Sequence, residues 1–497
     1  MKKTVLLIFP ILLMASQIDI NKKIEQLENE IELLKAQVAQ NAKETMQTKK
    51  QLIQNNNYID EQENILEKVE TKSILDKINF SPELLLRFDK LHYKNGKIPG
   101  ENTQIYNPDG TPTGVQRRDE YTKDFDIATT LRFRLNMNAN FDDLKFYGRM
   151  LYMNSSQANQ RLCILSQDVK TGTPGSAFDI DRAYIDYTFN TTSETPFTLS
   201  FGLLPTSGGT PMQYTQNRKR NALFPALVFD MNTYGLIGTQ KFSENTFARL
   251  VLAKPYTLRP NFYPYQCNRE NIDDANLLGL YADTKFYFLG SSLLSFGFNI
   301  INQLKAHPYL GPDVTSSNSH DLGTMITYGI GLDIENVHNT NTIIFMHIAL
   351  SNPHPNGNQD DYKIVAPLNA QLTANGYTGF TDANYASGGM VNKNGYALYF
   401  GTKYNFSQTL MIGAEFNYGS KYWFSATQGA EEMFNKLATR GTTYEAYITW
   451  QFYKYLNAKL GYLNIHEDYT GSGWHFGEPV KKDATQNITS FSLEAKF

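Results

Sequence analysis

The sequence predicts an all-β fold, a transmembrane antiparallel β-barrel of about 16 strands, preceded by an N-terminal α-helical coiled coil. Three observations predict it. Polar and apolar residues alternate through long segments of residues 78–497, the connections between segments are alternately short and long, and residues 18–73 repeat every seven residues. The 497 residues include 31 Tyr, 31 Phe and 3 Trp. No apolar run approaches the roughly 20 residues of a membrane helix.

The chain begins with a predicted secretory signal peptide at residues 1–16. Lys2 and Lys3 precede the apolar run 5–14, and small residues follow this run. A basic start, an apolar centre and a small-residue end are the three parts of such a peptide. We therefore expect cleavage near residues 15–17 and export of the mature protein.

Residues 17–77 are predicted to form a coiled coil that lies in the periplasm. Every seventh residue from Ile24 to Leu66 is Ile, Val or Leu except Thr45, and Pro and Gly are absent from the repeat. We expect a parallel homo-oligomer and favour a trimer, although the core residues suit two chains equally well. The alternative is a single amphipathic helix folded back on the protein.

The clearest strand pattern is a predicted hairpin at residues 124–154. From Thr130 to Asn138 every second residue is polar, and only Leu, Phe and Met lie between them. Because side chains alternate faces along a strand, one face is polar and cationic and the other is apolar. Nine or more alternating residues suit a strand that crosses an outer membrane, whereas strands of soluble proteins usually have five or six.

Sixteen alternating segments follow one another along the chain. They are 83–92, 124–140, 144–154, 179–190, 196–205, 229–242, 246–256, 275–289, 292–304, 324–337, 341–351, 395–406, 408–419, 442–454, 456–466 and 488–497. Every second connection is tight, and the others include long stretches such as 352–394. Outer-membrane barrels have their short turns in the periplasm, which predicts an outer-membrane location with the coiled coil on the periplasmic side. Phe497 ends an amphipathic strand and resembles the assembly signal of such barrels.

Five stretches of sequence carry a resemblance to a known family. They are LRFRLNMNA at 131–139, FYGRM at 146–150, DIDRAYIDY at 179–187, FGLLPTSGGTP at 201–211 and ALFPALVFD at 222–230. With the coiled-coil-plus-barrel layout, they resemble a porin-like outer-membrane family of Gram-negative bacteria, and the architecture is similar to that of general porins. The resemblance implies fold and location, and it implies no particular solute.

A barrel of about 16 strands is wide enough to enclose water, which predicts a passive diffusion channel for small polar solutes. Alternation directs a set of charged side chains toward the lumen. They are Arg132, Arg134, Arg149 and Arg182 from the early strands, and Asp333 and Glu335 from a later one. Charged pore walls set ion preference. The alternative is that these side chains are only solvated, or form Arg–carboxylate pairs that stiffen the wall.

In general porins the third loop folds into the barrel and forms the constriction, and the resemblance implies the same for the third long loop here, 206–228. Gly208, Gly209 and Pro211 allow sharp bends. Its cations are Arg218, Lys219 and Arg220. We expect them to bias the pore toward anions. The alternative is an exposed loop whose basic tip binds the phosphates of lipopolysaccharide.

Enzyme, cofactor and nucleic-acid functions are not expected. The sequence lacks a phosphate-binding glycine loop, zinc-spaced Cys and His, and a nucleophile elbow, and the net charge of −3 gives no field for nucleic acid. No metal site is predicted. Asp179 and Asp181, or Asp360 and its neighbour Asp361, offer carboxylates for calcium at the outer rim, but neither spacing matches a calcium-binding loop.

Cys163 and Cys267 fall in the second and fourth long loops. In an oxidising compartment they form either a disulfide that tethers the two loops or two free thiols.

A structural role is the alternative to the channel. In that role the coiled coil would tether the outer membrane to peptidoglycan, and the barrel would be only an anchor in lipid and lipopolysaccharide. A large strand number and a charged lumen favour the channel, because an anchor needs neither.

Overall fold

The computed structural model describes residues 77–95, 102–106, 112–117, 121–124, 127–155, 175–222, 224–255, 275–304, 323–357, 391–427, 434–469, 479 and 481–497. The chain divides into two compact units, Met1–Asp76 and Lys77–Phe497, and the described residues all belong to the second. The predicted signal peptide and the predicted coiled coil up to residue 76 lie outside the described residues. So do Cys163, Cys267 and the side chain of Asp179.

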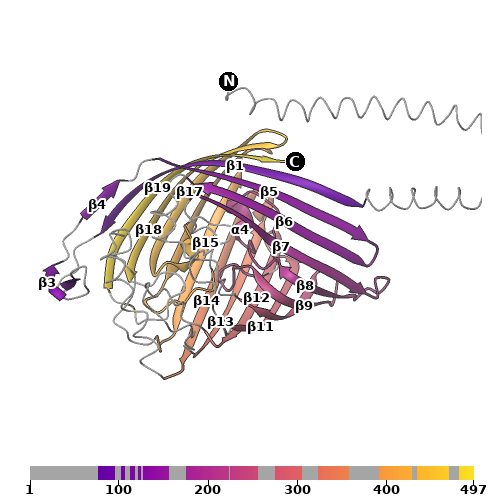
Figure 1. Cartoon of the computed structure of the whole chain (residues 1–497). Coiled ribbons are helices and arrows are strands. Elements are labelled where there is room, and N and C mark those ends of the chain that lie inside the picture. Colours follow the sequence, from indigo (N-terminus) through magenta and orange to yellow (C-terminus); the bar gives the residue numbers. More distant parts are fainter. Residues whose placement is uncertain are drawn as a thin grey trace, which may run out of the picture. The chain divides into compact units, whose positions relative to one another are not determined.

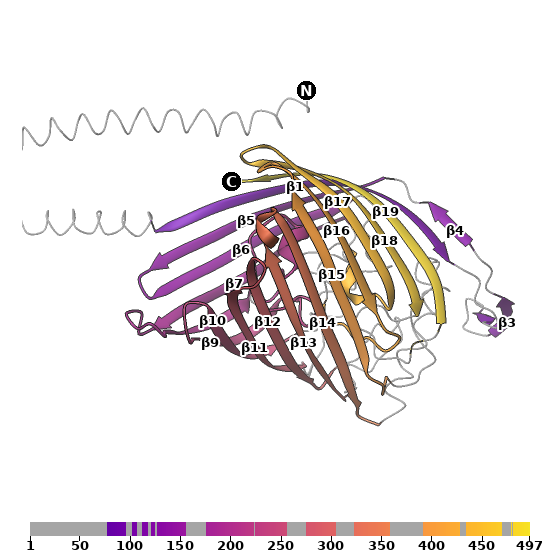
Figure 2. The same cartoon turned by 180° about the vertical axis from the view of Figure 1, so that it is seen from behind.

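Sixteen of the described strands form a closed antiparallel barrel (Figure 1). They are β1 (Ile78–Asn95), β5 (Ala128–Phe141), β6 (Leu144–Ser155), β7 (Gly175–Phe189), β8 (Phe197–Leu204), β9 (Thr233–Lys241), β10 (Thr246–Lys254), β11 (Asn276–Tyr287), β12 (Ser291–Asn302), β13 (Gly323–Glu335), β14 (Thr342–Pro355), β15 (Gly395–Asn405), β16 (Leu410–Gly419), β17 (Gly441–Tyr453), β18 (Leu456–Tyr469) and β19 (Lys481–Lys496). Each strand pairs with the next, and β1 closes the ring by pairing with both β5 and β19. The view from behind shows β12 to β16 side by side (Figure 2).

The predicted all-β barrel of about 16 strands is therefore confirmed, and each predicted segment corresponds to one strand. The largest difference is in β19, which begins at Lys481 rather than at 488. Its first outward-facing residues are polar, so the apolar half of the alternation is missing there. The short strands between β1 and β5 were not predicted; β2 (Asn102–Tyr106) pairs with β3 (Pro112–Arg117), and β4 (Tyr121–Asp124) pairs with β1.

The barrel has a short-turn rim and a long-loop rim. The connections after β5, β7, β9, β11, β13, β15 and β17 are the short ones, and the η2 turn (Val337–Asn339) lies in one of them. The long connections leave the opposite rim. Two of them, residues 205–232 between β8 and β9 and residues 420–440 between β16 and β17, have described parts that are mostly buried. We call them the first and the second inner segment; they contain helix α4 (Met212–Thr215) and helix η4 (Lys436–Ala438).

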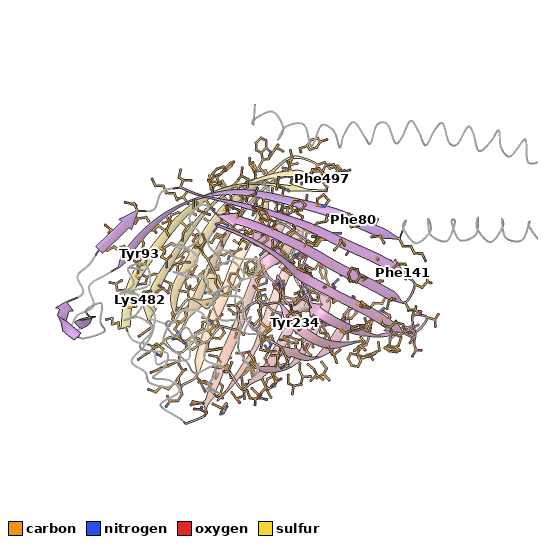
Figure 3. The ribbon with its side chains drawn as sticks, viewed as in Figure 1. Phe80, Tyr93, Phe141, Tyr234, Lys482 and Phe497 are labelled. Atoms are coloured by element: carbon orange, nitrogen blue, oxygen red, sulfur yellow. The ribbon has the colours of Figure 1, made fainter. Side chains whose placement is uncertain are left out.

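Apolar side chains cover the outside of the barrel, as the alternation predicted. On β17 the outward Ile448 and Trp450 are exposed, whereas the inward Tyr447 and Thr449 are buried. Among the residues labelled in Figure 3, Phe80 and Tyr234 belong to this exposed outer set. No helix among the described residues is long and apolar enough to span a bilayer. An outward apolar surface around a polar interior is the pattern of a membrane-spanning barrel.

Candidate constriction and lumen

The first inner segment is attached to one wall of the barrel by apolar packing. Phe224 and Phe229 are buried in a hydrophobic cluster with Val251 of β10 and Tyr281 of β11. The rings of Phe224 and Tyr281 have centroids 4.1 Å apart. The surface through which the segment contacts β9 to β13 is therefore hydrophobic, and burial of these aromatic groups holds the segment inside the barrel.

Two glycines shape the bend at the start of this segment, in agreement with the prediction. Gly208 has a positive φ of 77°, which an L side chain rarely adopts. A Cβ atom on Gly209 would lie 1.8 Å from the carbonyl oxygen of Phe224, so the two arms of the segment can approach only with glycine here. The backbone N–H of Gly208 donates to Asp230 Oδ1 at 2.6 Å, which closes the base of the loop.

Uncharged donors of the first segment bind carboxylates of the barrel wall. The Thr210 hydroxyl donates to Asp333 of β13, and Tyr214 donates to Glu335 Oε1 at 3.0 Å. Burial, with the charges of Asp333 and Glu335, raises the pKa of Tyr214 well above its usual range, so this phenol stays a donor. Both predicted lumenal acids therefore contact the segment.

The predicted basic tip also lies inside the barrel. Arg218 Nη2 is 3.0 Å from Glu494 of β19 and its Nη1 is 4.0 Å from Glu83 of β1. Arg132 of β5 reaches the same carboxylate of Glu494 at 3.4 Å. The structure thus brings two of the predicted cations, one from the segment and one from the wall, around a shared carboxylate.

The third cation of the tip binds a different side of the wall. Arg220 Nη2 lies 2.5 Å from Asp283 of β11, and Arg249 of β10 binds the other oxygen of this carboxylate at 3.1 Å. In the ring of strands β11 lies opposite β19. The tip from Arg218 to Arg220 therefore spans the interior, and Lys219 between them is exposed.

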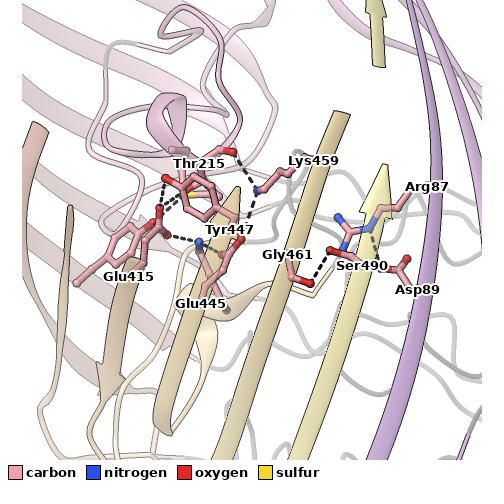
Figure 4. Close-up of polar contacts among 12 residues, drawn as sticks. Arg87, Asp89, Thr215, Glu415, Glu445, Tyr447, Lys459, Gly461 and Ser490 are labelled. Atoms are coloured by element: carbon pink, nitrogen blue, oxygen red, sulfur yellow. Dashed lines mark hydrogen bonds and ion pairs between the residues drawn. The ribbon is translucent and has the colours of Figure 1, made fainter. Parts of the chain in front are cut away.

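The second inner segment is held by a buried lysine. Lys436 Nζ lies 2.5 Å from Glu415 of β16 and 2.5 Å from Glu445 of β17. Lys459 of β18 joins this cluster at 3.4 Å from Glu445, and it donates to the Thr215 carbonyl at 3.0 Å (Figure 4). The Thr215 hydroxyl donates to Glu415, so this one carboxylate binds both inner segments.

The two inner segments also contact each other directly. The Asp230 N–H donates to the Ala426 carbonyl at 3.0 Å, and Phe424 joins the apolar cluster of the first segment. Trp423 is fully buried and donates its indole N–H to the Leu437 carbonyl at 2.9 Å. Sequence reasoning missed this second segment; its signal was a group of aromatic residues, 422–424, in a connection that should be polar if exposed.

The remaining predicted cations, on β5 to β7, are buried in the wall or bound to the first segment. Arg149 forms a buried bidentate pair with Asp181, with atoms 2.7 and 2.5 Å apart. Arg182 donates to the Ser207 carbonyl at 3.1 Å, and Arg134 is buried with 1% of its surface exposed. For Arg149 the geometry matches the alternative of a pair that stiffens the wall.

One histidine lies in the lumen. His347 of β14 is buried, and its Nε2 is 2.8 Å from Asp333 Oδ1, beside the contact with Thr210. Within the described part of the chain, no group of three or more His, Cys, Asp or Glu side chains has the arrangement of a metal site.

Comparisons with known proteins identify a family and similar folds. No curated protein matches the sequence. OprB of Pseudomonas putida at high pH has 10% identity and a TM-score of 0.47 over 86% of this chain and 96% of its own. Salmonella typhi OmpF in complex with daunomycin has 11% identity and a TM-score of 0.42 over 84% and 97%. The family model described as a protein of unknown function, DUF3373, matches residues 122–495, and the chain therefore belongs to the DUF3373 family.

Proposed function

We propose that this protein is an outer-membrane channel for the passive diffusion of small polar solutes. The observation that carries the proposal is a closed ring of sixteen strands with apolar side chains outside and polar side chains inside. A barrel of this strand number encloses more space than its wall side chains fill, so an aqueous lumen is expected. Its short-turn rim would face the periplasm.

We further propose that the first inner segment forms the constriction and biases the channel toward anions. Inward side chains on the described parts of β1, β5, β6 and β7 include six cations and four carboxylates. The cations are Arg87, Arg132, Arg134, Lys145, Arg149 and Arg182, and the carboxylates are Glu83, Asp89, Asp181 and Asp186. The tip adds the cations Arg218, Lys219 and Arg220 to this excess. A positive excess in a narrow pore favours anions.

The proposed assembly is a homotrimer in outer-membrane lipid and lipopolysaccharide, with the predicted coiled coil in the periplasm, where peptidoglycan is its proposed partner. A pure anchor would not need a segment that crosses the lumen between Glu494 and Asp283. The contacts of that segment therefore favour the channel over the tether.

Neutralisation of the tip tests the selectivity. In the variant R218Q/K219Q/R220Q, three positive charges are lost while Glu83, Glu494 and Asp283 keep theirs. We expect the anion-to-cation permeability ratio to fall by roughly twofold or more, because charged side chains at a narrow point of a pore set its ion preference. The measurement is the reversal potential of the refolded protein in a planar bilayer under a salt gradient.

A control variant with the same change in net charge is K90Q/K393Q/K481Q. These three lysines are exposed, and Lys90 and Lys481 lie on the outward face. Their loss should leave the reversal potential unchanged. Equal reversal potentials for the tip variant and the wild type would rule out the tip as the selectivity element.

A further inference from the structure

The inner face of the barrel has a covered side near the short-turn rim. On β13, β14 and β15 the inward residues Asp333, His347 and Tyr399 are at most 1% exposed. Ser295 of β12, in the same belt, is 2% exposed and donates to the Gly331 carbonyl. The inner segments occupy this side, because Thr210 and Thr215 bind its carboxylates.

The opposite side of the same belt, which we call the uncovered side, keeps several inward side chains partly exposed, although Arg134 of β5 and Arg149 of β6 are buried. The inward side chains of Arg87 and Glu83 on β1 are 22% and 21% exposed. Those of Lys459 on β18 and Lys496 on β19 are 25% and 26% exposed. Ser492 of β19 pairs with Arg87 and is also half-buried. Exposure inside a closed barrel means contact with water in the lumen.

The uncovered side continues onto the next strands. The inward Asn136 and Asn138 of β5, Tyr147 of β6 and Asp186 of β7 are half-buried. Tyr147 stacks on Tyr184 of β7 with ring centroids 4.8 Å apart, so these rings line the wall instead of filling the lumen. Among the described residues, no hydrogen bond or ion pair joins these side chains to either inner segment.

Docking of the apolar parts of both segments on one side explains the asymmetry. Apolar packing fixes the first segment to β9–β13 and β14–β15, and the second segment fills the space beside β16 and β17. The tip then reaches the edge of the uncovered side, where Arg218 and Arg132 share Glu494. Two guanidinium groups about one carboxylate are suited to bind a passing oxyanion.

We propose that, in the half of the barrel near the short turns, solutes pass only along the side formed by β18, β19, β1 and β5 to β7. Small oxyanions that carry a carboxylate or phosphate group are the favoured class, and Arg132 and Arg218 are the residues that select them. This inference rests on the proposed channel function, and it assigns to that channel one wall and one solute class.

Cysteine accessibility on the two sides tests the path. Ser492→Cys and Ser295→Cys are matched changes of one atom, in strands on nearly opposite sides of the ring and at similar distances from the short-turn rim. Both are made with Cys163 and Cys267 replaced by Ser. Two methanethiosulfonate reagents serve as probes, an anionic one with a sulfonate group and a cationic one with a trimethylammonium group. Each is added to single channels during recording. Each is also added to the folded protein, whose mass is then measured.

We expect Ser492→Cys to be modified with a fall in conductance, and to react at least about threefold faster with the anionic probe, since the positive excess concentrates it. Ser295→Cys should stay unmodified. Equal modification of both cysteines, or full modification at 492 without a change in conductance, would overturn the path. A cationic probe that reacts faster would overturn the solute class. A folded barrel that does not conduct would instead contradict the proposed channel function. The mass spectrum of that protein would still show which of the two cysteines is modified.

Discussion

Glu415 connects both inner segments to the barrel wall. Its carboxylate accepts from Thr215 of the first segment, pairs with Lys436 of the second and accepts from Tyr399 of the wall. A buried carboxylate is stable only when such partners replace its lost hydration. Both segments therefore share this one negative charge as a docking partner.

The change Glu415→Gln should loosen both inner segments. Removing one partner of a buried ion pair leaves Lys436 less well compensated and costs about 3–5 kcal/mol. We expect noisier single-channel currents with a higher mean conductance, and a lower midpoint of unfolding in urea. Currents with the wild-type amplitude and noise would contradict the role of Glu415 in docking.

The matched control is Glu467→Gln. Glu467 forms an equally short buried pair, 2.5 Å, with Lys482, but both residues belong to the wall, on β18 and β19. This change should lower the unfolding midpoint and leave conductance and current noise unchanged. Stability and segment docking are separated by comparing the two variants.

Gly209 is the second residue on which the inner segment depends. In Gly209→Ala the new methyl group would meet the Phe224 carbonyl oxygen at 1.8 Å, so the arms of the segment must separate. We expect a barrel that still folds, as judged by its heat-modifiable migration in gels, with an altered conductance. Gly238→Ala, whose nearest contact is the flexible Phe197 ring at 3.1 Å, should conduct like the wild type.

At the scale of elements, β7 contains a bulge that alternation did not predict. The register with β6 shifts between Arg149 and Met150, and Asp181 is the extra residue. Both Asp181 and Arg182 therefore face inward, and Asp181 meets Arg149. Strict alternation would have placed Asp181 on the outer face, and the sequence reading accordingly considered it only for a calcium site.

The bulge pair is expected to behave as a unit. Asp181→Leu alone should lower stability by about 3–5 kcal/mol, because it removes the carboxylate bound to the buried Arg149. The double variant R149M/D181L should recover most of this loss, since neither charge then remains buried without its partner. Unfolding midpoints in urea measure both variants. A double variant less stable than Asp181→Leu would show that Arg149 is held mainly by other contacts.

The sequence was sufficient for the strands because each buries one face, and the period of two is visible in residues such as Phe133 and Arg134. The bend at Gly208 and Gly209 was also readable, because turns of positive φ need glycine. The ion partners were not readable. Glu494 and Arg218 are separated by most of the chain, and only closure of the barrel brings them together.

The second inner segment was missed for a related reason. The buried residues of this segment, such as Trp423, Phe424 and Lys436, follow no periodic pattern. A segment that folds back into a barrel is buried by tertiary contacts and not by strand pairing. Burial of Lys436 depends on two carboxylates of the barrel wall, Glu415 of β16 and Glu445 of β17. Such a segment is visible only when the interior of the barrel is known.

At the scale of the whole molecule, three features fit a membrane channel. They are the apolar outer surface, the closed ring of strands and the two segments docked inside the ring. The ring removes every strand edge, as a bilayer requires. The segments occupy the interior without covering all of the side of β19, β1 and β5, where inward side chains such as Lys496 and Arg87 remain partly exposed. In the proposed channel, this wide barrel would thus contain a narrow, positively biased path.

The proposed function requires that this barrel conducts ions. The most direct test is the current of the refolded, full-length protein in a planar bilayer under a salt gradient. Discrete conductance steps, in groups of three for the proposed trimer, with a reversal potential on the anion side, are the expected result. A bilayer that stays electrically tight, although gels show a folded barrel, would contradict the channel function.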